Sequence, residues 1–169
     1  SNGSIFIEKY QDKFLEYIKT TSIGFSVDGA TPQTYFNIRK HNFLPTITKN
    51  LTSYFKKVNN HPYIDDHSAI VANINTVNLH EVSDLVKWAK DIGAKRLDLS
   101  LTYLEGTSTK IHKTPEVICN KTNWQKFWEA QLKAEELAKE LDFLVQFLVP
   151  FHGGFAPEEI IKSTRGFKY

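Results

Sequence analysis

Residues 22–39 read SIGFSVDGATPQTYFNIR and contain a complete transition from a strand to a helix. Ser22 to Val27 is short and mostly apolar, which predicts a strand. We expect Asp28-Gly29 to end that strand, because glycine tolerates a positive φ. Thr31-Pro32 then supplies an N-cap hydroxyl and a proline suited to the first helical turn, so a helix is predicted from Pro32 to about Arg39.

The same alternation of helices and strands continues along the chain. Further helices are predicted at 6–19, 44–58, 79–92 and 123–141, and further strands at 67–74, 96–102 and 143–149. Asn78 and Glu81 have the spacing of a capping box at a helix start, Gly93 ends that helix, and Asn123 is the predicted N-cap of the last one. This order favours βαβ units with right-handed crossovers, so the expected fold class is α/β with a parallel sheet.

The length and composition describe one folded domain. The 169 residues are 41% apolar and 24% charged, and they are too few for a complete eight-fold barrel, which needs about 250 residues. We expect residues 1–150 to form one domain and residues 151–169 a tail. Apolar runs such as Phe147 to Phe151 are far shorter than the roughly 20 residues that span a bilayer. The net charge of +2 without charge runs argues against a nucleic-acid or membrane surface.

Cysteine and histidine usage restricts the chemistry. The single cysteine, Cys119, excludes an intrachain disulfide and any multi-cysteine metal site built from this chain alone. The six histidines lack a metal-ligand spacing, so no metal ligand is predicted. A free cysteine fits a reducing compartment, and the expected location is the cytoplasm. No methionine is present, so we treat both termini as arbitrary cuts.

Ligands of parallel α/β folds meet the loops that follow the carboxyl ends of the strands. These loops are predicted at 26–39, 73–78, 102–106 and 150–154. Ser26 and Asp28 lie two residues apart, so both side chains point to one face and could bind a pair of hydroxyls. Asp28 could instead cap its own turn, Arg39 could be a solvated residue at a helix end rather than a bidentate ligand, and Asn78 is expected to be a helix cap.

Several short motifs carry a family resemblance. Residues 22–39 resemble the "S-x-D-G, turn, I-R" stretch in the middle of radical S-adenosylmethionine enzymes, especially the branch that modifies peptides and proteins. Three further stretches are similar to the family's T-N-G strand end, N-x-x-E helix start and A-x-x-L-G helix end, namely Ser1-Asn2-Gly3, Asn78 to Glu81, and Trp88 to Gly93. The resemblance covers about residues 1–104 and is strongest at 22–40.

The resemblance implies a fold and an activity. The chain would be the latter half of a partial (β/α)6 TIM-like barrel, with the strand at 22–27 as the fourth. The intact enzyme would cleave S-adenosylmethionine to a 5′-deoxyadenosyl radical that abstracts hydrogen from a substrate, for which a peptide is a candidate. The family's four-iron four-sulfur cluster needs several thiolates from a CxxxCxxC loop, and this chain has only Cys119. The chain alone is therefore expected to hold no cluster and to be inactive.

The resemblance also implies which residues bind the cofactor. Ser26 matches a ribose-contacting position, and Arg39 would lie near the cofactor or a carboxylate. Asn73 would meet the adenine or the ribose, and Asp28 and Asn2 complete the set of cofactor-binding candidates.

Two other interpretations remain open at this stage. The chain could be a barrel-derived domain without a cluster that serves as a binding or scaffold module. It could also be another parallel α/β enzyme that binds a phosphorylated metabolite near Gly153-Gly154 or a helix N-terminus. Half a barrel leaves strand edges unpaired, so we expect the chain to protect them, for instance by dimerising.

Overall fold

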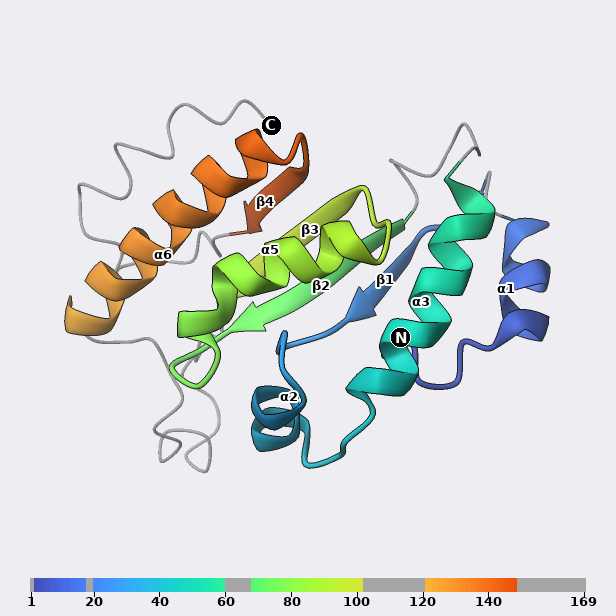
Figure 1. Ribbon diagram of the computed structural model, residues 1–169, viewed down its shortest axis with the longest axis horizontal. Coiled ribbons are helices and arrows are strands. Elements are labelled where there is room, and N and C mark those ends of the chain that lie inside the picture. Colours follow the sequence, from blue (N-terminus) through green and yellow to red (C-terminus); the bar gives the residue numbers. More distant parts are fainter. Residues whose placement is uncertain (1, 18–19, 60–67, 102–120, 149–169) are drawn as a thin grey trace.

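The computed structural model describes residues 2–17, 20–59, 68–101 and 121–148, with side chains described throughout these ranges except at 101, 121–125 and 148. In chain order the elements are α1 (Glu8–Leu15), β1 (Ile23–Ser26), α2 (Pro32–Arg39), α3 (Leu44–Val58), β2 (Ser68–Ile74), η1 (Leu79–Glu81), α5 (Val82–Asp91), β3 (Arg96–Leu101), α6 (Lys121–Glu140) and β4 (Leu144–Leu148) (Figure 1). The four strands are all parallel and form one sheet in the order β1-β2-β3-β4. The predicted α/β class with a parallel sheet is confirmed.

Most predicted elements are present, with differences at their ends. The bounds of α2 agree with the prediction, and Thr31 Oγ1 accepts a hydrogen bond from Thr34 N at 3.2 Å as its N-cap. The first helix is shorter than the predicted 6–19, because Phe6 precedes it and packs on Phe25 and Tyr54. Asn123 lies inside α6, which begins at Lys121, so its prediction as an N-cap is wrong. The polar stretch from Glu105 to Lys121, which the sequence predicts to be a loop, lies outside the described residues apart from Lys121, and so does the tail at 151–169.

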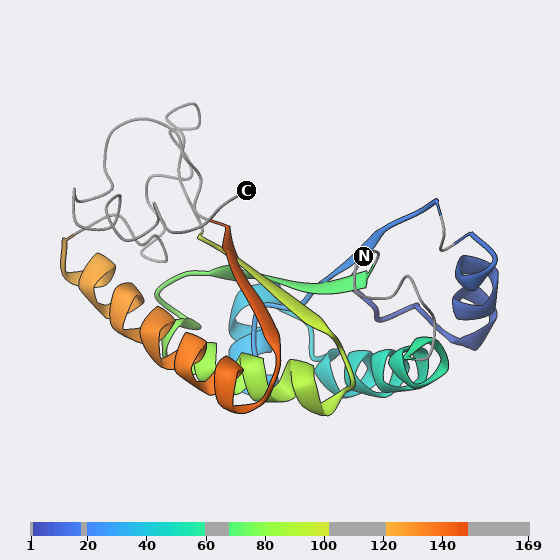
Figure 2. The ribbon, with the colours of Figure 1, turned by 90° about the horizontal axis from the view of Figure 1, so that it is seen from above.

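One face of the sheet is apolar and packs on helices. Helices α3, α5 and α6 lie in a layer along this face, and α1 lies beside α3 (Figure 2). Six strand side chains that point toward these helices have almost no solvent exposure, namely Phe25, Ile70, Ala72, Ile74, Leu97 and Leu99, and Ile23, Val145 and Phe147 are partly buried beside them. The hydrophobic core therefore sits between the sheet and the helices, where burial of apolar area stabilises the fold.

The opposite face of the sheet, here called the inner face, carries polar side chains. Because side chains alternate along a strand, the residues between the core positions point to this face. They are Gly24, Ser26, Ala69, Val71, Asn73, Arg96, Asp98, Ser100, Leu144 and Gln146. Parallel strands are usually apolar on both faces, so a polar inner face indicates a surface that meets something other than a helix layer.

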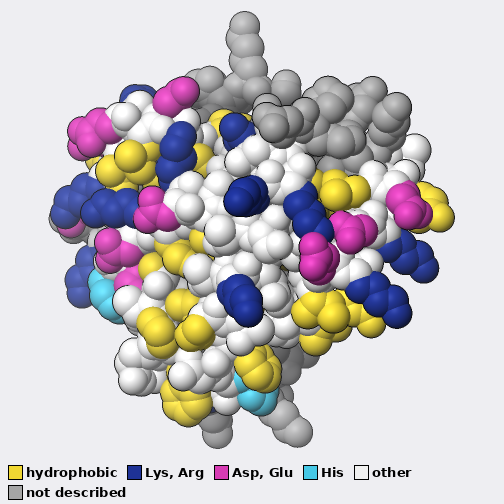
Figure 3. Space-filling model, turned by 45° about the vertical axis from the view of Figure 1, so that its right-hand side comes forward, with side chains coloured by type: hydrophobic (Ala, Val, Ile, Leu, Met, Phe, Trp, Pro, Cys, Tyr) yellow, Lys and Arg dark blue, Asp and Glu magenta, His cyan; other side chains and the backbone are white. Residues whose placement is uncertain are grey.

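The outer surface shows little that suggests a binding specificity. On the face drawn in Figure 3, basic and acidic side chains are interspersed, with apolar side chains between them. Within the described part of the chain, no helix is both long enough and apolar enough to cross a bilayer.

Gly29 is required for a different reason from the one that the sequence suggested. The strand ends before Asp28-Gly29 as predicted, but the glycines with a positive φ in the described residues are Gly3 and Gly93, so a positive φ is not what residue 29 supplies. A Cβ at Gly29 would instead lie 2.7 Å from the backbone nitrogen of Tyr35 and 3.0 Å from its Cα. The strand end can approach the first turn of α2 this closely only because residue 29 has no side chain.

We predict that Gly29→Ala destabilises the protein by about 1–3 kcal/mol, since a methyl group would clash with backbone that cannot rotate away. The measurement is the free energy of unfolding in urea. Gly24→Ala is the comparison, because its Cβ would meet only the Val71 Cγ2 methyl, at 3.0 Å, and should cost less. Equal stabilities of Gly29→Ala and the unmodified protein would contradict the close approach.

Candidate functional site

Three of the predicted site residues meet at the carboxyl end of β1. Arg39 Nη2 donates to Ser26 Oγ at 2.5 Å and lies 2.5 Å from Asp28 Oδ2. Helix α2 starts four residues after Asp28 and ends at Arg39, so the Arg39 guanidinium lies beside the end of the strand that precedes the helix. The Asp28 side chain is 3% exposed and that of Arg39 is 37% exposed. Arg39 therefore remains accessible while it pairs with a buried carboxylate.

A fourth predicted residue, Asn73, joins the same cluster at the end of β2. Its backbone N–H donates to Asp28 Oδ1 at 2.8 Å, and its Oδ1 accepts from Ser100 Oγ at 2.6 Å. The cluster thus links the carboxyl ends of three adjacent strands. Ser100 was not predicted as a site residue, although the alternation in RLDLSLT places it on the same face as the other polar side chains of β3.

Asn78 holds the loops after β1 and β2 together. This side chain is fully buried, its Nδ2 donates to the carbonyls of Asp28 and Asn73, each at 2.8 Å, and its Oδ1 accepts from Asn75 N at 2.8 Å. The helical segment that follows begins with the 3-10 turn η1. None of its backbone N–H groups donates a capping hydrogen bond to the Asn78 side chain. The prediction of Asn78 as a helix cap is therefore wrong, because its carboxamide satisfies loop backbone instead.

Glu81 closes the network from the other side. Its Oε2 accepts from Ala30 N at 2.9 Å and Thr31 N at 3.3 Å, and its Oε1 accepts from Thr31 Oγ1 at 2.6 Å and Thr34 Oγ1 at 2.7 Å. The predicted capping box with Asn78 is therefore wrong. The carboxylate caps α2, about 50 residues earlier in the chain, where a negative charge is favourable at the helix N-terminus.

The pKa of Glu81 reflects these contacts. Burial by itself would raise it, but hydrogen bonds from Thr31, Thr34 and the backbone of Ala30 outweigh burial and hold the pKa below the usual 4.5. Nearby, burial raises the pKa of Tyr35, with Arg39 opposing and Asp28 reinforcing the shift. At neutral pH the network therefore contains an ionised Glu81 and a protonated Tyr35.

Asn2 is the predicted site residue that the structure does not bring into this cluster. Its Oδ1 accepts from Ser4 N at 3.1 Å and Ser4 Oγ at 2.8 Å, in the turn before α1. The neighbouring Gly3 lies against the α3 side chains Leu51 and Ile47. The predicted ligand loops at 102–106 and 150–154 lie outside the described residues.

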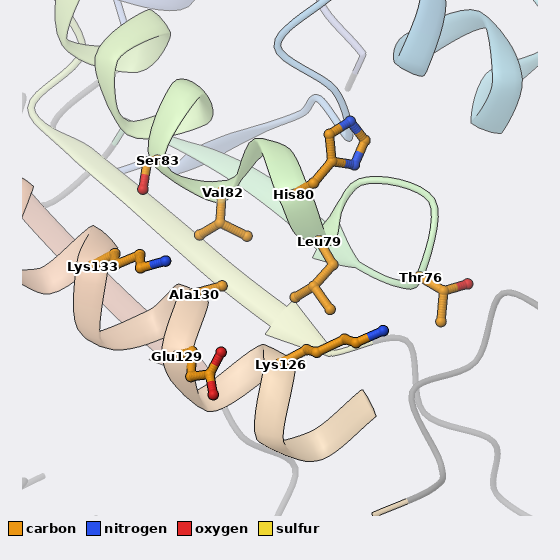
Figure 4. A pocket seen from close by; sticks show the side chains of 9 residues that line it. All are labelled: Thr76, Leu79, His80, Val82, Ser83, Lys126, Glu129, Ala130 and Lys133. Carbon is orange, nitrogen blue, oxygen red and sulfur yellow. The ribbon is translucent and has the colours of Figure 1, made fainter. Parts of the chain in front are cut away.

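Other parts of the described chain offer weaker sites. No group of three or more His, Cys, Asp or Glu side chains there could hold a metal ion. A groove of about 460 Å³ lies between α6 and the segment formed by η1 and the start of α5, where Lys126 and Lys133 of α6 lie opposite Leu79 and Val82 and Glu129 also lines the groove (Figure 4). The groove combines both signs of charge on the outer, helical side of the molecule, away from the inner face.

We predict that Glu81→Gln destabilises the protein at neutral pH by at least about 2 kcal/mol, since each buried donor without an acceptor costs about 1–3 kcal/mol. The lowered pKa means that the Glu81 carboxylate stabilises the fold above about 4.5 and that this stabilisation is lost as the pH falls below it. The variant should therefore lose less stability on acidification than the unmodified protein. The measurement is urea unfolding from pH 7 to pH 3.

The matched control is Glu16→Gln, which changes an exposed glutamate and should leave the stability at pH 7 unchanged. If Glu81→Gln is as stable as this control at pH 7, the four hydrogen bonds do not hold α2.

Sequence comparison assigns no family. No protein-family model matches the chain, and no curated protein matches it with a significant score.

Proposed function

We propose that this chain is the C-terminal part of a radical S-adenosylmethionine domain and that the inner face binds the nucleoside part of S-adenosylmethionine. One observation carries the proposal. Ser26, Asp28 and Arg39 of the 22–39 motif and Asn73 at the end of the next strand belong to one hydrogen-bonded cluster at the carboxyl ends of adjacent parallel strands. This is the end of a parallel sheet at which ligands bind.

The cluster presents the groups that a ribose and a purine need. Ser26 Oγ accepts from Arg39, which leaves its hydroxyl proton to donate to a ribose oxygen. The exposed guanidinium of Arg39 has further N–H donors for a hydroxyl or a carboxylate. Asn73 is exposed, and while its Oδ1 is bonded to Ser100, its Nδ2 can donate to an acceptor of the base. Asp28 uses both oxygens within the cluster, so it is a positioning residue.

The remaining parts of the reaction come from outside these residues. S-Adenosylmethionine supplies a 5′-deoxyadenosyl radical when it is cleaved reductively. One cysteine does not suffice for a four-iron four-sulfur cluster, so we derive no step through a cluster on this chain. What this chain contributes is binding and orientation of the nucleoside, next to a substrate for which we propose a peptide in a reducing, cytoplasmic setting.

The proposal predicts saturable binding of S-adenosylmethionine to the chain, measured by equilibrium dialysis with labelled ligand. Ser26→Ala and Arg39→Gln should each weaken binding by about tenfold, because a lost hydrogen bond of about 1.4 kcal/mol corresponds to tenfold in affinity. Lys49→Gln removes an exposed positive charge on α3 and serves as the matched control, with unchanged affinity.

Three results would contradict the proposal. Absence of saturable binding would favour a scaffold domain without a ligand. Equal binding by all three variants would place the ligand elsewhere on the chain. Displacement by inorganic phosphate, but not by 5′-deoxyadenosine, would favour the binding of a phosphorylated metabolite.

A further inference from the structure

Ser100 of β3 is not among the residues that the proposed function brings to the nucleoside, yet it contacts one of them. It pairs with Asn73 in the sheet register, and its side chain is half-buried. Ser100 Oγ lies 2.6 Å from Asn73 Oδ1 and 3.5 Å from the carbonyl oxygen of Ala72. A hydroxyl has one proton to donate, so these two acceptors compete for it.

The two distances decide how the Asn73 carboxamide is turned. Hydrogen bonds between two oxygens span about 2.5–3.0 Å, whereas those from a nitrogen to an oxygen span about 2.7–3.2 Å. The 2.6 Å contact therefore fits a Ser100 hydroxyl that donates to the amide oxygen, and it is too short for an amide nitrogen that donates to Ser100. The reversed carboxamide would also leave the Ser100 proton with only the Ala72 carbonyl, at 3.5 Å. Ser100 thus holds Asn73 Oδ1 toward β3.

The main chain of Asn73 is fixed as well. Its N–H donates to Asp28 Oδ1 and its carbonyl accepts from Asn78 Nδ2, each at 2.8 Å. With Oδ1 bonded to Ser100, the exposed side chain of Asn73 offers a ligand its amide nitrogen. An amide nitrogen donates hydrogen bonds and accepts none, so the ligand atom that it contacts is an acceptor.

The sheet register places Asn73 at a suitable distance for contact with the base. Ser26 pairs with Val71, and Asn73 lies two residues further along the same strand as Val71. Two residues along a strand and one strand spacing across separate the backbone positions of Ser26 and Asn73 by about 8 Å. A nucleoside whose ribose binds at Ser26 therefore has its base within reach of Asn73.

We infer, on the basis of the proposed function, that Ser100 is a positioning residue that makes Asn73 recognise a ring nitrogen of a purine and not the exocyclic amino group. The ring nitrogens of adenine are acceptors, whereas its amino group is a donor. An amide that presents its nitrogen pairs with the first and not with the second. Asn73 therefore selects purine nucleosides by a ring nitrogen, whether or not they carry the amino group.

The ligand atom is tested by equilibrium dialysis with the unmodified and Asn73→Ala chains. Purine riboside lacks the amino group of adenosine, so Asn73→Ala should weaken the binding of both nucleosides by the same factor, about tenfold. Three deazaadenosines each replace one of the ring nitrogens N1, N3 or N7 with C–H. One of them should bind the unmodified chain about tenfold more weakly than adenosine and lose nothing further in Asn73→Ala.

The role of Ser100 is tested with adenosine in a double-mutant cycle. Ser100→Ala frees the Asn73 carboxamide to turn and should weaken binding several-fold, but it should have no effect when Asn73→Ala is already present. Ser100→Thr keeps the hydroxyl on a residue suited to a strand and should bind like the unmodified chain. Ser83→Ala removes a half-buried hydroxyl on α5, away from the inner face, and is the matched control with unchanged affinity.

The outcomes separate this inference from the proposed function. Absence of adenosine binding to the unmodified chain would overturn both. Adenosine binding with a loss in Asn73→Ala that is larger for adenosine than for purine riboside, or that persists with all three deazaadenosines, would overturn the ring-nitrogen contact alone. An equal effect of Ser100→Ala with and without Asn73 would overturn the positioning role of Ser100.

Discussion

Four hydrogen bonds from Ala30, Thr31 and Thr34, at the N-terminal end of α2, converge on the Glu81 carboxylate, and the arrangement of the proposed nucleoside site follows from them. Glu81 is buried at the start of the segment after β2, so it fixes α2 relative to the sheet rather than relative to its own neighbours in sequence. Arg39 stands at the end of α2, and it reaches Ser26 and Asp28 only if that helix is correctly placed. Asn78 also holds the two strand ends together, because its Nδ2 donates hydrogen bonds to the carbonyl oxygens of Asp28 and Asn73.

The two faces of the sheet differ in polarity and in what they contact. The face toward α3, α5 and α6 contains apolar side chains that are almost fully buried, and it accounts for most of the core. The inner face carries a network of polar contacts at the carboxyl ends of the strands and an ion pair between Arg96 and Asp98 on β3. Stability and ligand recognition are thus separated by the alternation of side chains along each strand.

Residues that are neighbours in sequence predicted the helices and strands. The polar cluster depends on contacts between residues far apart in the sequence, which the sequence alone does not reveal. The bounds of α2 were predictable because Thr31 and Pro32 act within one helical turn. The roles of Asn78 and Glu81 could not be predicted in this way. A capping box describes neighbours in sequence, whereas both side chains bind backbone groups of the loop after β1. Gly29 was identified for the wrong reason, since its close neighbour is backbone six residues later. The polar residues of β3 were visible in the alternation of RLDLSLT, but only the sheet register places Asp98 in a row with Ser26 and Ser100 beside Asn73.

The central claim is that this sheet and its polar cluster belong to a radical S-adenosylmethionine domain. The most direct measurement is the iron content and the ultraviolet-visible spectrum of the complete gene product, expressed and purified without oxygen, before and after dithionite. The account predicts about four irons per chain and an absorption band that dithionite bleaches. A colourless product without iron would contradict it, and the inner face would then be the binding surface of a domain without radical chemistry.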